Sequence, residues 1–193
     1  GTARIAAAIK PLDLQDDDVI INLQGDEPLL PVALIQALHQ HARHKLDGAS
    51  GDGAFSVCTP LHEAAQLHDP NQVKVVLDHD RRALLFSRAA MPWVAGATAG
   101  QAAATLISQQ AVYLHHGLYA YPAATLRQWH SLPVGKLEQI ESLEQLRLLE
   151  NGLSISMLVS ALDDADLTRL RGVDTAADLQ RVRNLLMDQA PTA

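Results

Sequence analysis

Cysteine is scarce in this chain, with Cys58 the single one among 193 residues. It cannot form an internal disulfide, so we expect a reducing compartment. Basic residues are also few, because 15 Lys and Arg face 22 Asp and Glu and give a formal net charge of -7. That balance argues against a broad nucleic-acid surface, which needs a basic patch. No apolar run could span a bilayer and no signal-peptide layout opens the chain, so we expect a cytoplasmic protein that binds neither nucleic acid nor a membrane.

What the chain does have is enough apolar content for a core. Hydrophobic residues make up 48% of it, and its length fits a single domain over residues 1–193. Strand-like runs alternate with helix-like periods, which predicts an α/β domain with a mostly parallel sheet. The expected strands are 19–23, 54–61, 72–78, 82–88, 112–121 and 153–159, and the expected helices are 2–10, 32–45, 62–68, 122–131, 137–151 and one from 175.

Three of these segments lead to specific expectations. Residues 95–110 are rich in Ala, Gly and Gln without a clear period, so we expect a loop. The 137–151 helix is expected to turn an apolar stripe inward, formed by Leu137, Ile140, Leu143, Leu146 and Leu148. Alternation along the 112–121 strand places His116 on one face and a second set on the other, namely Tyr113, His115, Gly117, Tyr119 and Tyr121.

The first strand ends in an abrupt change of chemistry. Residues 19–23 are apolar and rich in β-branched side chains, which favours a buried strand, and Gln24-Gly25-Asp26-Glu27 follows them. In an open parallel sheet, ligands bind beyond the carboxyl ends of the strands, where a carboxylate can hold Mg²⁺ against nucleotide phosphates. Asp26 is therefore the first candidate metal ligand. The alternative is that Asp26 and Glu27 open a solvated turn before Pro28.

A second aspartate precedes the last helix. Thr175 and Asp178 are spaced for a capping box, so the helix is expected to begin at Thr175, directly after Asp174. Carboxylates brought together from positions 26 and 174 would repel by about 4 kcal/mol at ~4 Å and an effective dielectric of ~20, unless a cation lay between them. The alternative for Asp174 is a helix-start anion, which the helix dipole stabilises by ~0.3–1 kcal/mol.

Six short motifs occur in an order that resembles one enzyme family. They are Leu23 to Pro28, Asn71 to Asp78, Phe86-Ser87-Arg88 with Met91-Pro92-Trp93, His115 to Tyr121, Leu143 to Arg147 and Gly172 to Thr175. Each is weak alone, but six in order argue against coincidence. Over its whole length the chain resembles the 3-deoxy-manno-octulosonate cytidylyltransferases, or CMP-Kdo synthetases.

The resemblance implies a fold and a reaction. The fold would be a Rossmann-like, GT-A-like nucleotidyltransferase of three layers with a mostly parallel sheet. The reaction would join CTP to the acid sugar 3-deoxy-manno-octulosonate (Kdo), giving CMP-Kdo and pyrophosphate for lipopolysaccharide biosynthesis. The anomeric hydroxyl of Kdo would attack the α-phosphate without a covalent enzyme intermediate. Mg²⁺ held by Asp26 and Asp174 would offset charge on the phosphoryl oxygens.

The resemblance also implies contacts with the sugar. Arg88 resembles the position that meets the Kdo carboxylate, a role that suits a guanidinium fork, and the alternative is a strand-end arginine in solvent. The remaining sugar-contacting set is Gln24, His115, Tyr119, Glu144 and Gln145. For Glu144 the alternative is a surface helix pair with Arg147, and for His115 and Tyr119 it is packing on a half-buried strand.

The start of the chain departs from the family pattern. Gly1-Thr2-Ala3-Arg4 resembles the end of a Ser-Gly-Thr-Glu-Arg motif, in which Thr2 and Arg4 would bind nucleotide. The first βα units of the fold and the basic loop that grips the CTP phosphates would precede it. We therefore expect this chain alone to be inactive, with an apolar sheet edge left uncovered.

Two alternative functions remain open. One is a related cytidylyltransferase acting on sialic acid or a Kdo analogue. The other is a non-catalytic truncated remnant that at most dimerises or binds sugar. The resemblance further implies a homodimer, with residues 80–120 as a candidate β insertion for dimerisation or substrate binding.

Overall fold

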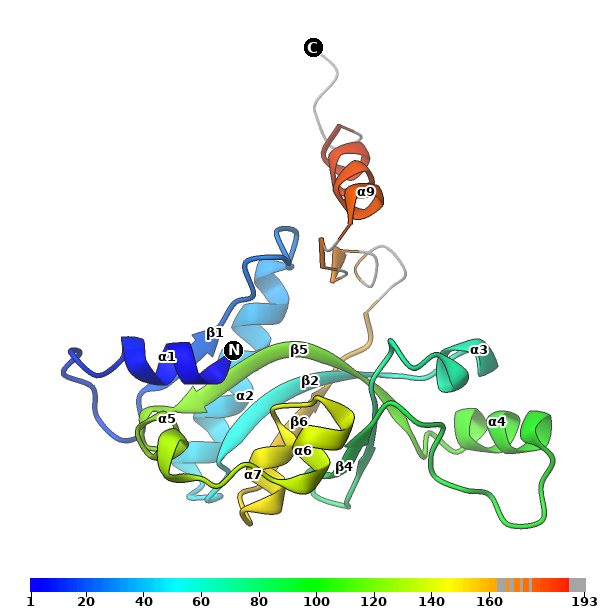
Figure 1. The fold of residues 1–193 in the computed structure, drawn as a ribbon, viewed down its shortest axis with the longest axis horizontal. Coiled ribbons are helices and arrows are strands. Elements are labelled where there is room, and N and C mark those ends of the chain that lie inside the picture. The colour runs from blue at the N-terminus through cyan, green and yellow to red at the C-terminus, as the bar shows by residue number, and fades with distance from the viewer. Residues whose placement is uncertain (163–165, 167–168, 171, 174, 188–193) are drawn as a thin grey trace.

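The computed structural model describes residues 1–162, 166, 169–170, 172–173 and 175–187. A six-stranded sheet lies at its centre, with helices around it (Figure 1). The strands are β1 (Val19–Asn22), β2 (Ala54–Pro60), β3 (Lys74–Leu77), β4 (Ala83–Ser87), β5 (Tyr113–Pro122) and β6 (Ile155–Val159). The helices are α1 (Thr2–Ala8), α2 (Val32–Asp47), α3 (Ala64–His68), α4 (Ala99–Ser108), α5 (Ala123–Gln128), the 3-10 turn η1 (Trp129–Ser131), α6 (Lys136–Glu141), α7 (Leu146–Glu150) and α9 (Ala176–Met187).

The long strand β5 organises the sheet. Along one edge it pairs with β2 over residues 113–120, and β2 in turn pairs with β6. Two strands share its other edge, since β3 pairs at residues 113–114 and β1 pairs at residues 119–122. Between these two pairings, residues 115–118 of β5 border the place where β1 ends and β3 begins. The arrangement leaves room beside the middle of β5.

The α/β class is confirmed, but the expectation of a mostly parallel sheet is wrong. Among the described strands, β2 and β6 form the parallel pair, whereas β1–β5, β2–β5, β3–β5 and β3–β4 are antiparallel. The cause is β5, which runs between β1 and β2 in the opposite direction and separates two strands that are parallel to each other. A pattern of alternating strands and helices cannot show which strand inserts between which.

Apolar side chains hold helices on both faces of the sheet, as expected for three layers. On one face, Ala6 of α1, Leu126 of α5 and Leu146 of α7 belong to a core cluster with Phe86 of β4. On the other face, α2 packs against β2 and β5 through a second cluster. A third cluster holds α3 and α4 beside the start of β5, at one end of the molecule (Figure 1).

The loop expected at 95–110 is wrong, because these residues contain α4. Thr98 caps this helix: its hydroxyl accepts from the backbone N–H of Gln101, and the Gln101 side chain accepts from the backbone N–H of Thr98. This reciprocal capping box defines a helix start without any apolar period.

The single helix expected at 137–151 is also wrong, because the chain forms α6 and α7 separately. Ser142 adopts a left-handed conformation with φ 53°. The Glu141 carbonyl accepts a hydrogen bond from Arg88 Nε at 2.9 Å. Leu137 and Ile140 are consequently 42% and 78% exposed, while the rest of the expected inward stripe is buried. A contact distant in sequence has overridden the local period.

The last helix begins where the capping box predicts. The Thr175 N–H donates to the Asp178 carboxylate at 3.0 Å, and the Asp178 N–H donates to the Thr175 hydroxyl at 3.2 Å. α9 lies apart from the sheet in Figure 1, and Leu179 and Leu186 of its expected apolar face are 42% and 52% exposed. β1 is half-buried rather than buried, because among the described strands it pairs with β5 alone. None of the described helices is long and apolar enough to cross a bilayer.

Candidate active site

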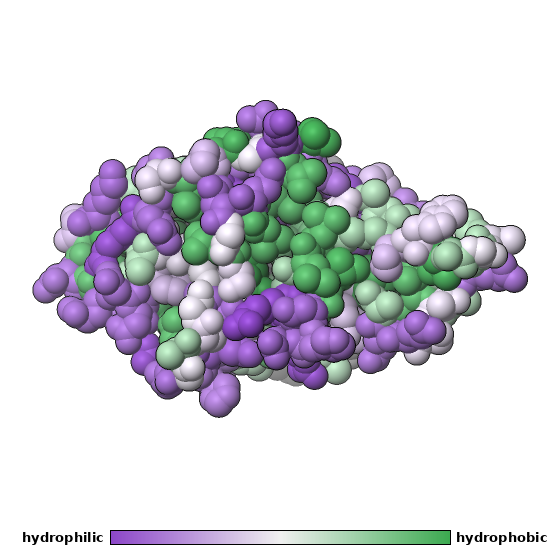
Figure 2. Space-filling view, turned by 90° about the horizontal axis from the view of Figure 1, so that it is seen from below, coloured by the Kyte–Doolittle hydropathy of each residue, from purple (hydrophilic) through white to green (hydrophobic). Residues whose placement is uncertain are grey.

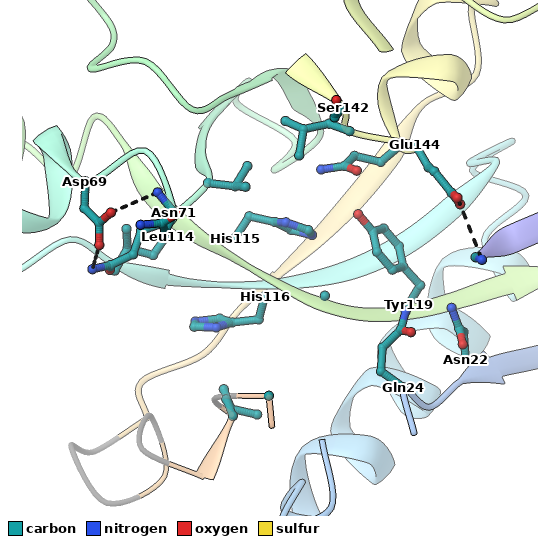
Figure 3. A pocket seen from close by; sticks show the side chains of 18 of the residues that line it. Asn22, Gln24, Asp69, Asn71, Leu114, His115, His116, Tyr119, Ser142 and Glu144 are labelled. Atoms are coloured by element: carbon teal, nitrogen blue, oxygen red, sulfur yellow. Dashed lines mark hydrogen bonds and ion pairs between the residues drawn. The ribbon is translucent and has the colours of Figure 1, made fainter. Parts of the chain in front are cut away.

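A cavity of about 1160 Å³ opens beside the middle of β5 (Figure 3). Its lining comes from β5, the start of α1, the segment after β1, residues 63–73 around α3, residues 142–145 between α6 and α7, and part of 170–178. Single-ligand pockets usually measure roughly 300–1,000 Å³. The volume of the cavity therefore lies slightly above this range.

Five of the six residues expected to contact the sugar line this cavity, namely Gln24, His115, Tyr119, Glu144 and Gln145, and the sixth, Arg88, does not. Figure 3 shows His115 and Tyr119 on one side of β5 and His116 on the other, so the predicted alternation is confirmed for these three. The ring centroids of His115 and Tyr119 lie 5.4 Å apart. The structure thus brings the set together, and its contact with a sugar stays a prediction.

Burial keeps both histidines of β5 neutral. His115 Nε2 lies 3.0 Å from Ser56 Oγ, and its ring centroid lies 4.9 Å from that of Phe86. His116 Nε2 lies 2.9 Å from Thr59 Oγ1. Loss of hydration lowers the pKa of His115 to about 3 and that of His116 to about 4. At neutral pH each ring is therefore an uncharged hydrogen-bonding group.

The Tyr119 hydroxyl has no hydrogen-bond partner among the described residues, although it is buried. The residue is 7% exposed, and its ring stacks on that of Tyr121 with centroids 5.7 Å apart. Buried polar groups nearly always have a partner, so an unpaired one needs an explanation. Burial raises the pKa of Tyr119 well above its usual value, and the phenol keeps its proton. A ligand oxygen that reaches this hydroxyl could accept a hydrogen bond from it.

Glu144 is engaged with α1. Its Oε2 accepts from the Thr2 backbone N–H and from the Thr2 hydroxyl, both at 2.9 Å. Burial alone would raise the pKa of Glu144, but the bonds from Thr2 outweigh it and lower the pKa. The expected alternative of a Glu144–Arg147 pair is wrong, because Arg147 Nε donates to Glu138 at 2.8 Å.

Asp26 is exposed and does not line the cavity itself, but it lies beside Gly172, which does. Its carbonyl accepts from the Val173 N–H at 2.8 Å, and a Cβ on Gly172 would lie 3.5 Å from its Oδ2. Glu27 lies over β5, where a Cβ on Gly117 would lie 3.6 Å from its Oε1. Burial and the charge of Asp26 raise the pKa of Glu27 to about 7.

The structure describes one of the two proposed metal ligands, Asp26. Asp174 lies outside the described residues, while its neighbours Gly172 and Val173 are the residues that contact Asp26. Within the described part of the chain, no three His, Cys, Asp or Glu side chains come together as a metal site. The metal ligands therefore stay a prediction.

Three of the predicted site residues that the structure describes do not line the cavity, namely Asp26, Arg88 and Arg4. Arg88 is half-buried, and its guanidinium donates to the carbonyls of Glu141 at 2.9 Å and Pro70 at 3.0 Å. The alternative of a strand-end arginine in solvent is thus wrong, and contact with a carboxylate is untested. Arg4 is exposed on α1, whereas its neighbour Thr2 lines the cavity.

Sequence patterns did not indicate the polar wall beside α3. Glu63, Gln66, Asp69 and Asn71 all line the cavity. The motif beginning at Asn71 was the available signal, but the residues before it read only as a short helix and a turn. His116 was likewise assigned no role, although it also lines the cavity.

Known proteins resemble this chain closely enough to test its family. A family model described as cytidylyltransferase matches residues 1–155. A 3-deoxy-manno-octulosonate cytidylyltransferase from Nitrosococcus oceani is 44% identical over 191 residues, which cover 98% of this chain and 70% of that protein. An 8-amino-3,8-dideoxy-manno-octulosonate cytidylyltransferase from Shewanella amazonensis is 40% identical over 190 residues, covering 96% of this chain and 68% of that protein.

A solved structure supports the same relationship. It is described as CMP:2-keto-3-deoxy-manno-octonic acid synthetase complexed with CTP, and it matches this fold with a TM-score of 0.78 and 32% sequence identity. The match covers 97% of this chain and 68% of that one.

Proposed function

The chain belongs to the cytidylyltransferase family that includes the 3-deoxy-manno-octulosonate enzymes, and from that premise we propose that it joins CTP to Kdo. The products are CMP-Kdo, for lipopolysaccharide biosynthesis, and pyrophosphate. One observation carries this proposal: five of the six side chains expected to contact the sugar come from three separate segments and line one cavity.

The wall of the cavity suits a polyhydroxy acid. Neutral His115, the unpaired Tyr119 hydroxyl and the amides of Gln24 and Gln145 offer oriented donors and acceptors without a fixed positive charge. The Kdo carboxylate then requires a cation, for which we propose Arg88 after a movement that frees its guanidinium from the Pro70 carbonyl. The role of these groups is to fix the anomeric hydroxyl in line with the α-phosphate.

Membership of the family points to a divalent metal ion, and we propose Mg²⁺ held by Asp26 and Asp174. Four carboxylates line the cavity, those of Glu63, Asp69, Glu144 and Asp178, and they would repel the triphosphate of CTP. The exposed Asp26 carboxylate beside Gly172 is an oxygen donor of the kind Mg²⁺ prefers. When bound, the ion would neutralise charge on the phosphoryl oxygens.

Pyrophosphate release tests the proposal, measured in the complete protein that carries this sequence with CTP, MgCl₂ and a panel of acid sugars. We expect turnover with Kdo to exceed turnover with sialic acid by at least a hundredfold. The 8-amino analogue of Kdo is the second candidate, because one relative is named for it. Equal or faster turnover with that analogue would make it, and not Kdo, the assigned substrate. Absence of turnover with every acid sugar would favour the alternative of a non-catalytic remnant.

We further propose that the protein acts as a cytoplasmic homodimer, with residues 80–120 in the contact. Leu84 on β4 and Trp93 in the following loop are 62% and 87% exposed. Figure 2 shows an apolar band across the underside of the molecule, the side on which β4 lies in Figure 1. Contact between two such bands would remove apolar surface from water.

A further inference from the structure

A fully buried lysine holds two parts of the cavity wall together. Lys74, the first residue of β3, is 0% exposed. Its Nζ donates to three main-chain carbonyls, those of Asp69 and Gln72 at 2.7 Å each and that of Arg88 at 2.6 Å. Because an ammonium group has three donors, all of its hydrogen-bonding capacity is used by the backbone. Lys74 does not line the cavity itself.

Two of these carbonyls belong to the first wall, formed by residues 69–73. Asp69, Asn71, Gln72 and Val73 line the cavity on the α3 side. The Lys74 ammonium binds this short stretch at two points, residues 69 and 72, and so fixes its curvature. The wall is also attached to β5, because the His115 N–H donates to the Val73 carbonyl at 2.9 Å.

The third carbonyl leads to the second wall, formed by residues 142–145. The Arg88 backbone N–H donates to Glu141 Oε2 at 2.9 Å, and Arg88 Nε donates to the Glu141 carbonyl at 2.9 Å. Ser87 Oγ donates to the other oxygen of the same carboxylate at 2.5 Å. Glu141 directly precedes the four wall residues. Arg88 Nη1 also reaches the first wall, at the Pro70 carbonyl.

We propose that Lys74 is a positioning residue for the acid-sugar site, because its ammonium fixes the distance between wall 69–73 and wall 142–145. Glu144 and Gln145 belong to the second wall, so a loss of this constraint weakens the binding of the sugar more than that of the nucleotide. The inference rests on the proposed function and adds to it the residue that sets the width of the sugar site.

The test compares Lys74→Met with wild type in the complete protein. Methionine keeps a long aliphatic side chain but donates to none of the three carbonyls. We expect the KM for the acid sugar to rise at least tenfold, while the KM for CTP changes less than twofold. In the ligand-free protein, amide hydrogen exchange in peptides covering 69–73 and 141–146 should become at least tenfold faster. Exchange in α2 should stay unchanged.

Two further variants keep the proposal falsifiable. Glu141→Gln alters the other end of the connection and should raise the same KM if Lys74→Met fails to fold. Lys10→Met removes an exposed lysine and should match wild type in both readouts. A folded Lys74→Met protein with wild-type KM values, or with faster exchange in 69–73 alone, overturns the proposal. Absence of product from the wild type would instead refute the proposed function, since the exchange readout needs no substrate.

Discussion

The buried hydroxyl of Tyr119 should have opposite effects on stability and on sugar binding. Tyr119→Phe removes a polar group that has no partner in the described structure, so the free energy of unfolding should stay equal or rise by up to about 1–3 kcal/mol. The KM for the acid sugar should rise at least fivefold, because the ligand loses the donor we assign to it. Urea unfolding and steady-state kinetics measure the two effects. A drop in stability with unchanged KM would mean that the hydroxyl is bonded within the protein.

The neutral histidines of β5 should make stability depend on pH. In the unfolded chain they take up protons near pH 6.5, whereas in the folded state their pKa values are about 3 and about 4. Stability is therefore complete above pH 6.5 and falls on acidification towards pH 4, by about 1.4 kcal/mol per pH unit for each histidine. Glu27, with its pKa raised to about 7, opposes this trend between pH 4.5 and 7.

His116→Leu isolates one of these contributions. The unfolded state of this variant binds one proton fewer at acidic pH. The slope of the unfolding free energy against pH, between pH 6 and 4.5, should therefore decrease by about 1.4 kcal/mol per pH unit. Urea titrations at several pH values measure this slope. An unchanged slope would contradict the assignment of His116 as a buried neutral group.

At the scale of single elements, α4 depends on its cap. Thr98→Ala removes the hydroxyl that accepts from the Gln101 N–H, and loss of such a cap costs about 0.5–2 kcal/mol. Because α4 contributes Ala103 and Leu106 to the core cluster beside β5, the loss should appear as a lower midpoint of global thermal unfolding. Ser108→Ala, at the exposed end of the same helix, is the control and should change the midpoint by less than half as much.

Local signals predicted the elements that local contacts define. The strands, α2 and the capping box at Thr175 all follow from periods or spacings within a few residues, and the structure has them. The division of 137–151 could not be predicted in this way, because it depends on Arg88 binding Glu141, 53 positions away. The set predicted to contact the sugar comes from motif resemblance, and only the fold shows that five of its six members share one cavity.

In the whole molecule, the directions of the strands and the assembly of subunits are features that sequence patterns do not predict. The insertion of β5 between β1 and β2 determines where the site lies. The residue patterns within these three strands do not predict that insertion. Assembly is testable at an exposed apolar side chain of the 80–120 segment: Leu84→Glu puts a charge on β4 and should halve the molar mass measured by light scattering. Leu12→Glu, which charges an exposed leucine beyond 80–120, should leave the mass unchanged. Equal masses for Leu84→Glu and wild type would exclude this face from a dimer.

Phosphorus NMR of the complete protein incubated with CTP, Kdo and MgCl₂ follows the proposed reaction itself. We expect the three CTP signals to give way to pyrophosphate and one phosphodiester signal from CMP-Kdo, and we expect Asp26→Asn to slow this at least a hundredfold while leaving the fold intact. Unchanged CTP signals, or release of free CMP without a phosphodiester, would contradict the proposed reaction.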